Sequence, residues 1–541
     1  MRSRFVGRMF RAARSVSAAV GLLQAVVIPG TAQPEAQAAH TFFRVQAASA
    51  LTTPVSGRLL IFLKPGSGAN AVDNDEMHPT GTWICAREVR DLKPGDTVEV
   101  DADETAFPQP FSELGAGMYE AQAVLDVDHD YNYHGRTTED WVSPVVTLAG
   151  WHPGSAAEPE LVLDHHPPES PRLAAFERLK QAATPDVAQL QELQSVLLTK
   201  FWGHPVSLRA WVILPPGYSG GAGSYPTYPT AYWTHGFGGD LNGALVTGLR
   251  IYERMKARSM PPMIWVMLDE SCADGTHEFD DSVNNGPWGA ALTTEFIPYL
   301  ESKYRMDARR DGRFLNGHSS GGWATLQLEI DYPKIFGGTW STSPDPSDFH
   351  DFTGVDLYAA HANVFHRADG TPYPLVRNQG EVVATFEQFT HLEDVMGAYG
   401  GQIKSFDWVF SPKSPSGAPE PMFDHTTGDV DPEVVAYWRA HYDLAVMAET
   451  HWAERGADLK GRIHLYVGTA DTFYLDGAAH KLDAVLGRLG ADAQFHFLPG
   501  RTHFDLYGVG KDRMGLFDEI GERMWQVARP GQKWNRAGTG K

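Results

Sequence analysis

The sequence feature that most constrains this chain is a Gly-x-Ser-x-Gly pattern with Ser319 at its centre. An apolar run over 313–315 leads into the pattern, and helix-forming residues over 323–329 follow it. A strand, a sharp turn and a helix in this order form a nucleophile elbow, in which strained backbone lifts the serine hydroxyl clear of the sheet. With 54 glycines in the chain, the pattern could also mark an ordinary Gly/Ser-rich loop. The flanking strand and helix favour the elbow and make Ser319 the candidate nucleophile.

The length of 541 residues is too great for one ordinary core and predicts two domains. The first residues have a composition of their own: five arginines, then an apolar run over 16–28, then small residues at Ala36 and Ala38. This pattern predicts a secretory signal peptide over 1–38, and so a secreted or periplasmic protein. A single membrane anchor is the alternative, but 13 apolar residues are too few to cross a bilayer.

The formal net charge is −22, and it would become −26 if residues 1–38 were removed with their five arginines and Glu35. A chain this acidic repels nucleic acid and anionic membrane surfaces, so neither is expected as a partner, and membrane insertion is not expected either. The sequence leaves the oligomeric state open.

The chain has only two cysteines, Cys85 and Cys272, which lie far apart in the sequence. In an oxidising compartment they could form one bridge between domains, and the alternative is two unpaired buried thiols. The sequence contains no Cys/His spacing that is typical of a metal site, so no metal is expected.

The segment 39–165 predicts an antiparallel β-sandwich of the immunoglobulin type. Short alternating runs over 57–63, 97–101 and 117–125 are separated by Pro/Gly turns. No catalytic constellation lies in it. Its expected role is to support an enzyme domain, with a glycan- or substrate-binding face as the alternative.

The segment 166–205 is predicted to be a linker followed by a helix over 185–200. From 206 to 528, strands alternate with helical segments, which predicts an α/β protein with a mostly parallel sheet. The helix expected over 291–300 contains Pro298, which should kink it. The predicted strands, besides the one before Ser319, cover 208–214, 230–234, 264–268, 337–341, 463–467 and 494–498.

Between about 345 and 450 the alternation of strands and helices stops, and the sequence becomes rich in aromatic residues. An insertion that follows the carboxyl end of a strand lies over the site in open α/β sheets. We therefore expect a cap over the pocket, and the alternative is an insertion with a small core of its own.

A serine becomes a nucleophile only when a base removes its proton and a carboxylate orients that base. In an α/β-hydrolase the acid and then the histidine follow the serine along the chain. Asp471 follows the strand over 463–467, with Asp476 as its rival, and His503 follows the strand over 494–498. The predicted triad is therefore Ser319, Asp471 and His503.

Acyl transfer also needs donors for the oxyanion of the tetrahedral intermediate. We expect one from the backbone N–H of Ser320 and one from the backbone N–H of Phe237, in a loop over 235–239 that contains three glycines. The alternative for this loop is a tight turn that needs glycine only for its geometry.

The Ser319 motif, the loop over 235–239 and the segments 282–289 and 499–503 together resemble the putative-esterase family. That family also contains enterochelin esterases, feruloyl esterases, S-formylglutathione hydrolases and mycolyl transferases. The resemblance covers roughly 200–345 and 455–510, and its motifs mark Gly236, His318 and Trp288 as candidate substrate-binding residues. It implies an α/β-hydrolase fold, an acyl-serine intermediate and no metal or organic cofactor. An amino-terminal β-sandwich is similar to the layout of enterochelin esterases, whereas the insertion over 345–450 departs from the compact members.

The resulting expectation is an exported serine esterase that acts on a small-molecule or glycan-linked ester. An acyltransferase with an alcohol as acceptor is the first alternative, because the same triad serves both reactions. A catalytically silent, hydrolase-like binding protein is the second. The sequence does not identify the acyl or alcohol group.

Overall fold

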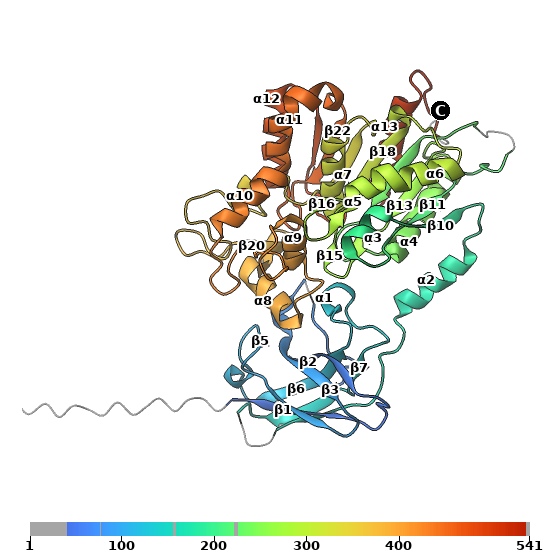
Figure 1. Cartoon of the computed structure of the whole chain (residues 1–541). Helices are drawn as coiled ribbons and strands as arrows, with labels where there is room; N and C mark the ends of the chain where they lie inside the picture. The colour runs from blue at the N-terminus through green and yellow to red at the C-terminus, as the bar shows by residue number, and fades with distance from the viewer. Residues whose placement is uncertain (1–39, 76, 155–157, 221–224, 537–541) are drawn as a thin grey trace, which may run out of the picture. The chain divides into compact units, whose positions relative to one another are not determined.

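The computed structural model describes residues 40–75, 77–154, 158–220 and 225–536 (Figure 1). The signal peptide predicted over 1–38 therefore lies outside the described residues. Within the described ranges, no helix combines the length and the apolar character that crossing a bilayer requires.

Among the described residues, the largest sheet has eight strands (Figure 1). The second strand in the order given below runs antiparallel to both of its neighbours, and all the other neighbouring strands are parallel to each other. In spatial order the strands are β10 (Ala188–Gln194), β11 (Ser207–Ile213), β13 (Ile264–Leu268), β12 (Thr230–Thr234), β18 (Arg313–His318), β19 (Thr339–Thr342), β22 (Ile463–Gly468) and β23 (Gln494–Leu498). This mostly parallel sheet, with helices between its strands, confirms the α/β prediction.

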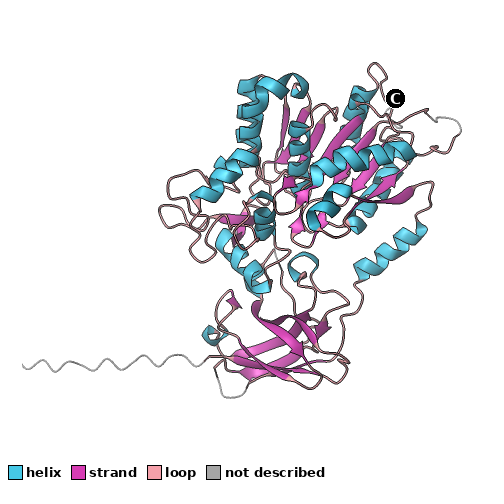
Figure 2. Cartoon of the chain, viewed as in Figure 1, coloured by secondary structure: helices cyan, strands magenta, loops and turns pink. Residues whose placement is uncertain are grey.

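Helices cover both faces of this sheet, as the cyan and magenta elements of Figure 2 show. Successive side chains of a strand point to opposite faces, so Trp211 and Ile213 pack in one core while Ala210 and Val212 pack in the other. The first core is completed by α4 (Leu241–Lys256) and α13 (Gly515–Ala528). The second is completed by α5 (Trp288–Ala291), a π-helical turn over Leu292–Phe296 and α6 (Ile297–Lys303). Further helices of this part are α2 (Pro171–Ala182), α3 (Val196–Trp202), α7 (Ser320–Asp331) and α12 (Asp476–Leu489).

The helix predicted over 185–200 is wrong. Strand β10 occupies the middle of this range and pairs along its whole length with β11, and α3 begins only after Ser195, whose hydroxyl caps it. Leu190, in the middle of the predicted helix, is 42% exposed on this edge strand. Pairing with the sheet has therefore overridden local helix propensity. The predicted linker also differs, because α2 begins at Pro171.

The predicted helix over 291–300 is interrupted as expected, but not by a simple kink. A π-helical turn over Leu292–Phe296 joins α5 to α6, and Pro298 lies in the first turn of α6, where a missing N–H is tolerated. Small strand pairs precede α5, formed by β14 (Ser271–Cys272) with β15 (Gly275–Thr276) and β16 (Asp281–Ser282) with β17 (Gly286–Pro287).

The amino-terminal part forms two sheets, which share one buried core. Most strand pairs are antiparallel as predicted, but β1 and β9 pair in parallel. The smaller sheet contains β4 (Thr97–Asp101), β1 (Phe42–Ala47) and β9 (Glu160–Leu163). The larger contains β5 (Ala106–Phe107), β3 (Trp83–Leu92), β2 (Val55–Pro65), β6 (Gly117–Asp126), β7 (Trp141–Val142) and β8 (Val146–Trp151), and a short helix α1 (Tyr131–His134) follows β6.

Both cysteines are unpaired, so the bridge considered from the sequence is absent. Cys85 is buried in strand β3, and Cys272 lies in β14 of the other part of the chain.

The insertion is largely helical and shares its core with the sheet domain. Its buried side chains pack with Trp323 and Leu326 of α7 and with Leu465 of β22, so it has no separate core. Its elements are β20 (Pro374–Asn378), β21 (Glu381–Thr385), α8 (Phe386–Met396), α9 (Gln402–Phe410), α10 (Pro432–His441) and α11 (Leu444–Leu459), which ends outside the predicted range. Single 3-10 turns cover Pro79–Gly81, Phe111–Glu113, Arg310–Gly312 and Phe349–Asp351.

Candidate active site

Ser319 lies in the sharp turn between β18 and α7, with φ 61° and ψ −125°. A positive φ is strained for a residue with a side chain, and here it points the hydroxyl away from the sheet. The turn needs glycine on both sides. A Cβ at Gly317 would lie 2.1 Å from the carbonyl oxygen of Gly321, and a Cβ at Gly321 would lie 2.1 Å from that of His235. The strand, turn and helix expected of a nucleophile elbow are all present.

His503 and Asp471 meet at the same edge of the sheet, after β23 and β22 respectively. His503 Nδ1 lies 3.0 Å from Asp471 Oδ2, and both side chains are buried. Asp471 Oδ1 accepts a hydrogen bond from the backbone N–H of Phe473. Burial alone would raise the pKa of Asp471, but the charge and hydrogen bond of His503 lower it below its usual value. Asp471 is thus an ionised partner that fixes the imidazole.

The rival carboxylate, Asp476, does not contact His503. It begins helix α12, and its Oδ1 lies 3.1 Å from Arg377. The structure therefore brings Asp471, and not Asp476, to the candidate base.

Ser319 and His503 line one cavity, but the serine hydroxyl is bonded elsewhere. Ser319 Oγ lies 3.3 Å from Asp345 Oδ1, and Ser320 Oγ lies 2.7 Å from Asp345 Oδ2. Among the described residues, no hydrogen bond joins Ser319 Oγ to His503. Sequence reasoning missed Asp345, although it follows β19 in Ser-Pro-Asp-Pro, at the edge where the other site residues emerge.

The two residues expected to supply oxyanion donors lie close to Ser319: Ser320 follows it, and Phe237 lines the same cavity. Ser320 is the first residue of α7, so its N–H is one of the unpaired donors at the start of a helix. Gly236 and Phe237 line the cavity beside Ser319. A Cβ at Gly236 would lie 2.7 Å from the Cβ of Ser319, so only glycine allows this close approach. The oxyanion hole expected from the N–H groups of Phe237 and Ser320 stays a prediction, with which the close approach of the loop to Ser319 is compatible.

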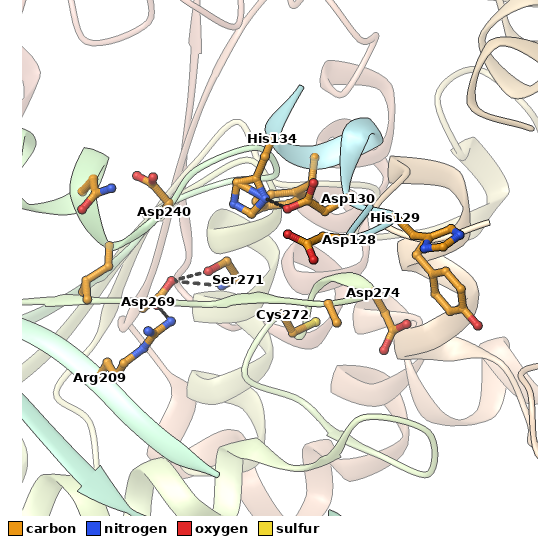
Figure 3. A pocket seen from close by; sticks show the side chains of 15 residues that line it. Asp128, His129, Asp130, His134, Arg209, Asp240, Asp269, Ser271, Cys272 and Asp274 are labelled. Carbon is orange, nitrogen blue, oxygen red and sulfur yellow. Dashed lines mark hydrogen bonds and ion pairs between the residues drawn. The ribbon is translucent and has the colours of Figure 1, made fainter. Parts of the chain in front are cut away.

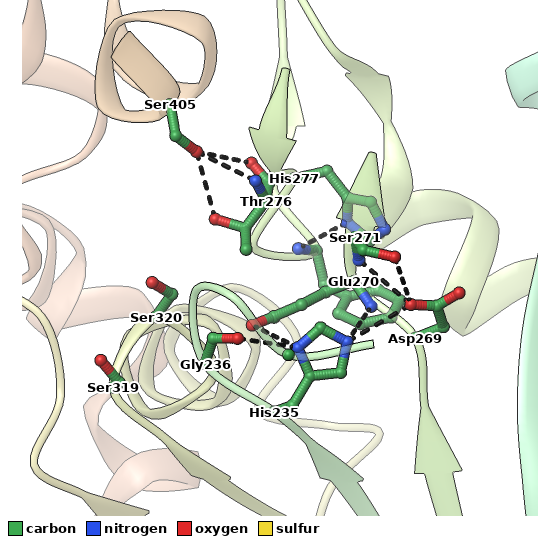
Figure 4. Close-up of polar contacts among 12 residues, drawn as sticks. His235, Gly236, Asp269, Glu270, Ser271, Thr276, His277, Ser319, Ser320 and Ser405 are labelled. Carbon is green, nitrogen blue, oxygen red and sulfur yellow. Dashed lines mark hydrogen bonds and ion pairs between the residues drawn. The ribbon is translucent and has the colours of Figure 1, made fainter. Parts of the chain in front are cut away.

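The His235 side chain anchors this loop through hydrogen bonds (Figure 4). Its Nδ1 donates to the carbonyl of Gly236 at 2.8 Å, and its Nε2 accepts from the backbone N–H of Glu270 at 3.1 Å. Asp269 Oδ1 lies 3.3 Å from the same Nε2. Burial would lower the pKa of His235, but the carboxylates of Asp269 and Glu270 raise it. A buried hydrogen-bond network therefore anchors the loop over 235–239.

The predicted substrate-binding residues separate into two groups. Gly236 and His318 line the cavity, where the ring centroids of His318 and His503 are 4.4 Å apart. Burial and then the neighbouring His503 lower the pKa of His318 to about 3, so it is neutral. Trp288 does not line the cavity. It stacks on His277 and donates to the carbonyl of Asn285 in the second core, so a substrate contact does not fit its position.

The cavity that holds Ser319 and His503 has a volume of about 320 Å³ and is lined mainly by apolar side chains. Phe473 and Phe504 flank His503, and Met77 enters from the amino-terminal part. The insertion contributes Phe352, Thr353, Leu375, Val376, Phe386, Phe389, Gln402, Ile403 and Phe406. A pocket of this kind suits an apolar group with a few placed polar contacts.

A larger cavity of about 800 Å³ is lined by residues of the amino-terminal part and of the sheet domain (Figure 3). Asp269 is joined there to Arg209 at 2.6 Å and to Ser271. Five of its fifteen lining residues are aspartates, namely Asp128, Asp130, Asp240, Asp269 and Asp274. It contains none of the predicted triad, so it is not the site of the proposed chemistry.

Two clusters in the described residues bring potential metal ligands together: His40 with Asp101 and Asp103, and Asp348 with His350 and Asp443. In the second, the carboxylates already accept hydrogen bonds that fix local backbone. Neither cluster includes a residue of the Ser319 cavity.

The sequence matches the family described as "Putative esterase" over residues 206–493, more than half of the chain. It is 32% identical over 166 residues to an esterase of Mycobacterium tuberculosis, Rv1288 in strain H37Rv, and equally to its counterpart in strain CDC 1551. That match covers 30% of this chain and about a third, 35%, of the relative. The structure is also similar to a solved ferulic acid esterase, at 14% identity and a TM-score of 0.38 over 63% of this chain and 98% of the other.

Proposed function

This chain belongs to the Putative esterase family, and from that premise we propose that it is a serine esterase that cleaves a carboxylic ester through an acyl-serine intermediate. The observation that carries the proposal is the pairing of His503 with Asp471 at 3.0 Å, beside Ser319 in one cavity. A nucleophile in a strained turn, a base and a carboxylate that orients the base are the parts that acyl transfer requires.

In the proposed reaction, His503 Nε2 takes the proton of Ser319 as Oγ attacks the ester carbonyl. The N–H groups of Phe237 and Ser320 stabilise the oxyanion of the tetrahedral intermediate. Its collapse breaks the bond to the alcohol oxygen, which receives the proton from His503. A water molecule then attacks the acyl-serine, gives its proton to His503 and releases the acid, and the proton returns to Ser319 Oγ.

We propose that the insertion acts as a cap that selects the acyl group. Seven of the 22 residues that line the cavity of about 320 Å³ are aromatic or aliphatic residues of the insertion, namely Phe352, Leu375, Val376, Phe386, Phe389, Ile403 and Phe406. Because that lining is mainly apolar, the favoured acyl group is a bulky apolar one, either aromatic or aliphatic, on a small-molecule or glycan-linked ester.

The proposed function is tested by a hydrolysis screen with acetyl, butyryl, octanoyl and feruloyl esters. Release of the acid with the bulkier acyl groups preferred supports the proposal, and no turnover of any ester contradicts it. Adding an acceptor alcohol separates the two reactions of the same triad, because a transferase would form a new ester in place of the free acid.

Phe389→Ala is expected to raise the KM for an octanoyl or feruloyl ester about tenfold, with little change for an acetyl ester. Phe389 lines the cavity and is only half-buried, so its loss removes apolar contact with the acyl group at limited cost to the core. Steady-state kinetics on the two esters provide the measurement. Phe201→Ala, at an exposed position outside the cavity, is the matched control. Equal losses on both esters would show that Phe389 supports the catalytic core and not substrate selection.

We also propose that the protein is exported and that residues 1–38 are removed, as the arginines and the apolar run over 16–28 suggest. Amino-terminal sequencing of the protein from the periplasm or medium is expected to begin after Ala38. Recovery of the chain only from the cytoplasm, with Met1 or Arg2 at its start, would contradict export.

We further propose that the two amino-terminal sheets form a β-sandwich domain that supports the cap. Both sheets contribute to one core, and Arg58 and Asn132 donate hydrogen bonds to the carbonyls of Val395 and Gly397 at the end of α8. An experimental structure in which the two sheets shared no core would contradict this proposal.

A further inference from the structure

A carboxyl group that does not belong to the predicted triad lies against the candidate nucleophile. Asp345 presents one oxygen to Ser319 Oγ and the other to Ser320 Oγ, at 3.3 and 2.7 Å. Asp345 is 4% exposed and lines the catalytic cavity. No step of the proposed ester hydrolysis uses it, so its position needs its own explanation.

Backbone hydrogen bonds hold Asp345 next to the turn that carries Ser319. Its N–H donates to the carbonyl of Ser319 at 3.2 Å, and the N–H of Ser319 donates to the carbonyl of Thr342 at 3.1 Å. The segment after β19 is thus bound to the turn at two points, so the carboxyl group cannot move far without moving the nucleophile.

The surroundings of Asp345 oppose a negative charge. Glu270 and Glu278 are both fully buried nearby, and neither carboxylate oxygen of Glu278 has a hydrogen-bond partner among the described residues. A negative charge on Asp345 raises the pKa of both Glu270 and Glu278, so the ionised forms of these carboxyl groups disfavour one another. Burial raises the pKa of Asp345 to about 6 and that of Glu270 to about 8.

Other charged and titratable groups face Asp345 from neighbouring elements. His503 lies on the loop after β23 and favours the ionised form, whereas Asp471 lies after β22 and disfavours it. The groups that face Asp345 are the hydroxyls of Ser319 and Ser320, the imidazole of His503, and the carboxyl groups of Asp471, Glu270 and Glu278. None of these belongs to a lysine or an arginine that would hold Asp345 ionised.

We propose that Asp345 is a positioning residue that acts as a neutral carboxylic acid, with its O–H donating to Ser319 Oγ and its other oxygen accepting from the Ser320 hydroxyl. This inference rests on the proposed function. When Ser319 Oγ accepts from Asp345, its own hydrogen is free to point to His503, as the triad requires. An ionised Asp345 would instead accept that hydrogen and hold it away from the base.

The test compares Asp345→Asn with Asp345→Ala in the full chain. An asparagine amide can donate to Ser319 Oγ and accept from Ser320 as the neutral acid does, but it cannot ionise. We expect Asp345→Ala to lower kcat and the rate of fluorophosphonate labelling at least about tenfold, with KM nearly unchanged. We expect Asp345→Asn to stay within about threefold of wild type at pH 5.

The pH dependence separates this role from a merely structural one. The neutral form is lost as the pH rises through about 6, so kcat/KM of the wild type is expected to fall relative to Asp345→Asn between pH 5 and 8. The ratio of kcat/KM of the wild type to that of Asp345→Asn reports the titration of Asp345 alone, because both proteins keep His503 and Asp471. Asp369→Asn, at an exposed position of the insertion, is the control and should match the wild type.

Three results would overturn the inference: Asp345→Ala equal to wild type, Asp345→Asn as weak as Asp345→Ala, or a wild-type to Asn ratio that is independent of pH. If Asp345→Ala does not fold, as judged by circular dichroism, the pH ratio alone decides. If the wild type is labelled and Ser319→Ala is not, such results would refute only the role of Asp345. If the wild type is neither labelled nor active, the proposed function fails, and this inference fails with it.

Discussion

Ser319→Ala is expected to lower kcat for ester hydrolysis by up to about a million-fold while leaving the fold unchanged. The substitution removes one oxygen from a side chain whose hydrogen-bond partner, Asp345, keeps its second contact with Ser320. The strained φ of 61° remains, because alanine also has a Cβ. Loss of turnover would therefore report the missing nucleophile. Steady-state kinetics and thermal unfolding of the purified full chain provide the two measurements.

Ser416→Ala, at an exposed position of the insertion, is the matched control and is expected to keep full activity. Near-normal turnover by Ser319→Ala would contradict the assignment and make the neighbouring hydroxyl of Ser320 the next candidate. Loss of activity together with a large fall in the unfolding temperature would instead indicate that the elbow requires Ser319 for its structure.

Asp471→Asn is expected to lower kcat about 10,000-fold with little change in KM. Asp471 is fully buried, accepts from His503 Nδ1 and has a pKa below its usual value, so it is the negative partner of the imidazole. An amide would be free to donate to Nδ1, which would favour the tautomer with its hydrogen on Nε2, and that tautomer cannot accept the proton of Ser319.

Asp476→Asn is the matched comparison, since Asp476 lies five positions later and pairs with Arg377. It is expected to change kcat less than about threefold, because Asp476 makes a partly exposed ion pair with Arg377, whereas the carboxylate that pairs with His503 is Asp471. A larger loss of kcat in Asp476→Asn than in Asp471→Asn would mean that the acid has been assigned to the wrong carboxylate.

The strands around the site could be predicted because they are short, continuous apolar runs bounded by Pro or Gly turns. The strands over 230–234 and 264–268 were placed to the residue in this way. The run over 188–194 failed because its sequence, Ala-Gln-Leu-Gln-Glu-Leu-Gln, has strong helix formers and a polar exposed side. Only its pairing with β11 makes this run a strand. Because β11 comes after α3 and a further turn, local periodicity cannot reveal this pairing.

The candidate site was predictable where chain order carries the information. Ser319, Asp471 and His503 each follow a strand of a parallel sheet, and the carboxyl ends of such strands meet at one edge. The position of Trp288 could not be derived in this way, because nothing in the sequence shows that its ring turns into the core to stack on His277. Asp345 was missed for a related reason: its contact with Ser319 depends on two backbone hydrogen bonds after β19 that no motif encodes.

The central claim, an acyl group carried by Ser319, is tested most directly by mass spectrometry of the enzyme quenched in acid during turnover of a p-nitrophenyl ester. The account predicts one added acyl mass on the peptide that contains Ser319, and no added mass in Ser319→Ala. An acyl group on any other residue, or continued hydrolysis by Ser319→Ala with no acylated peptide, would contradict it.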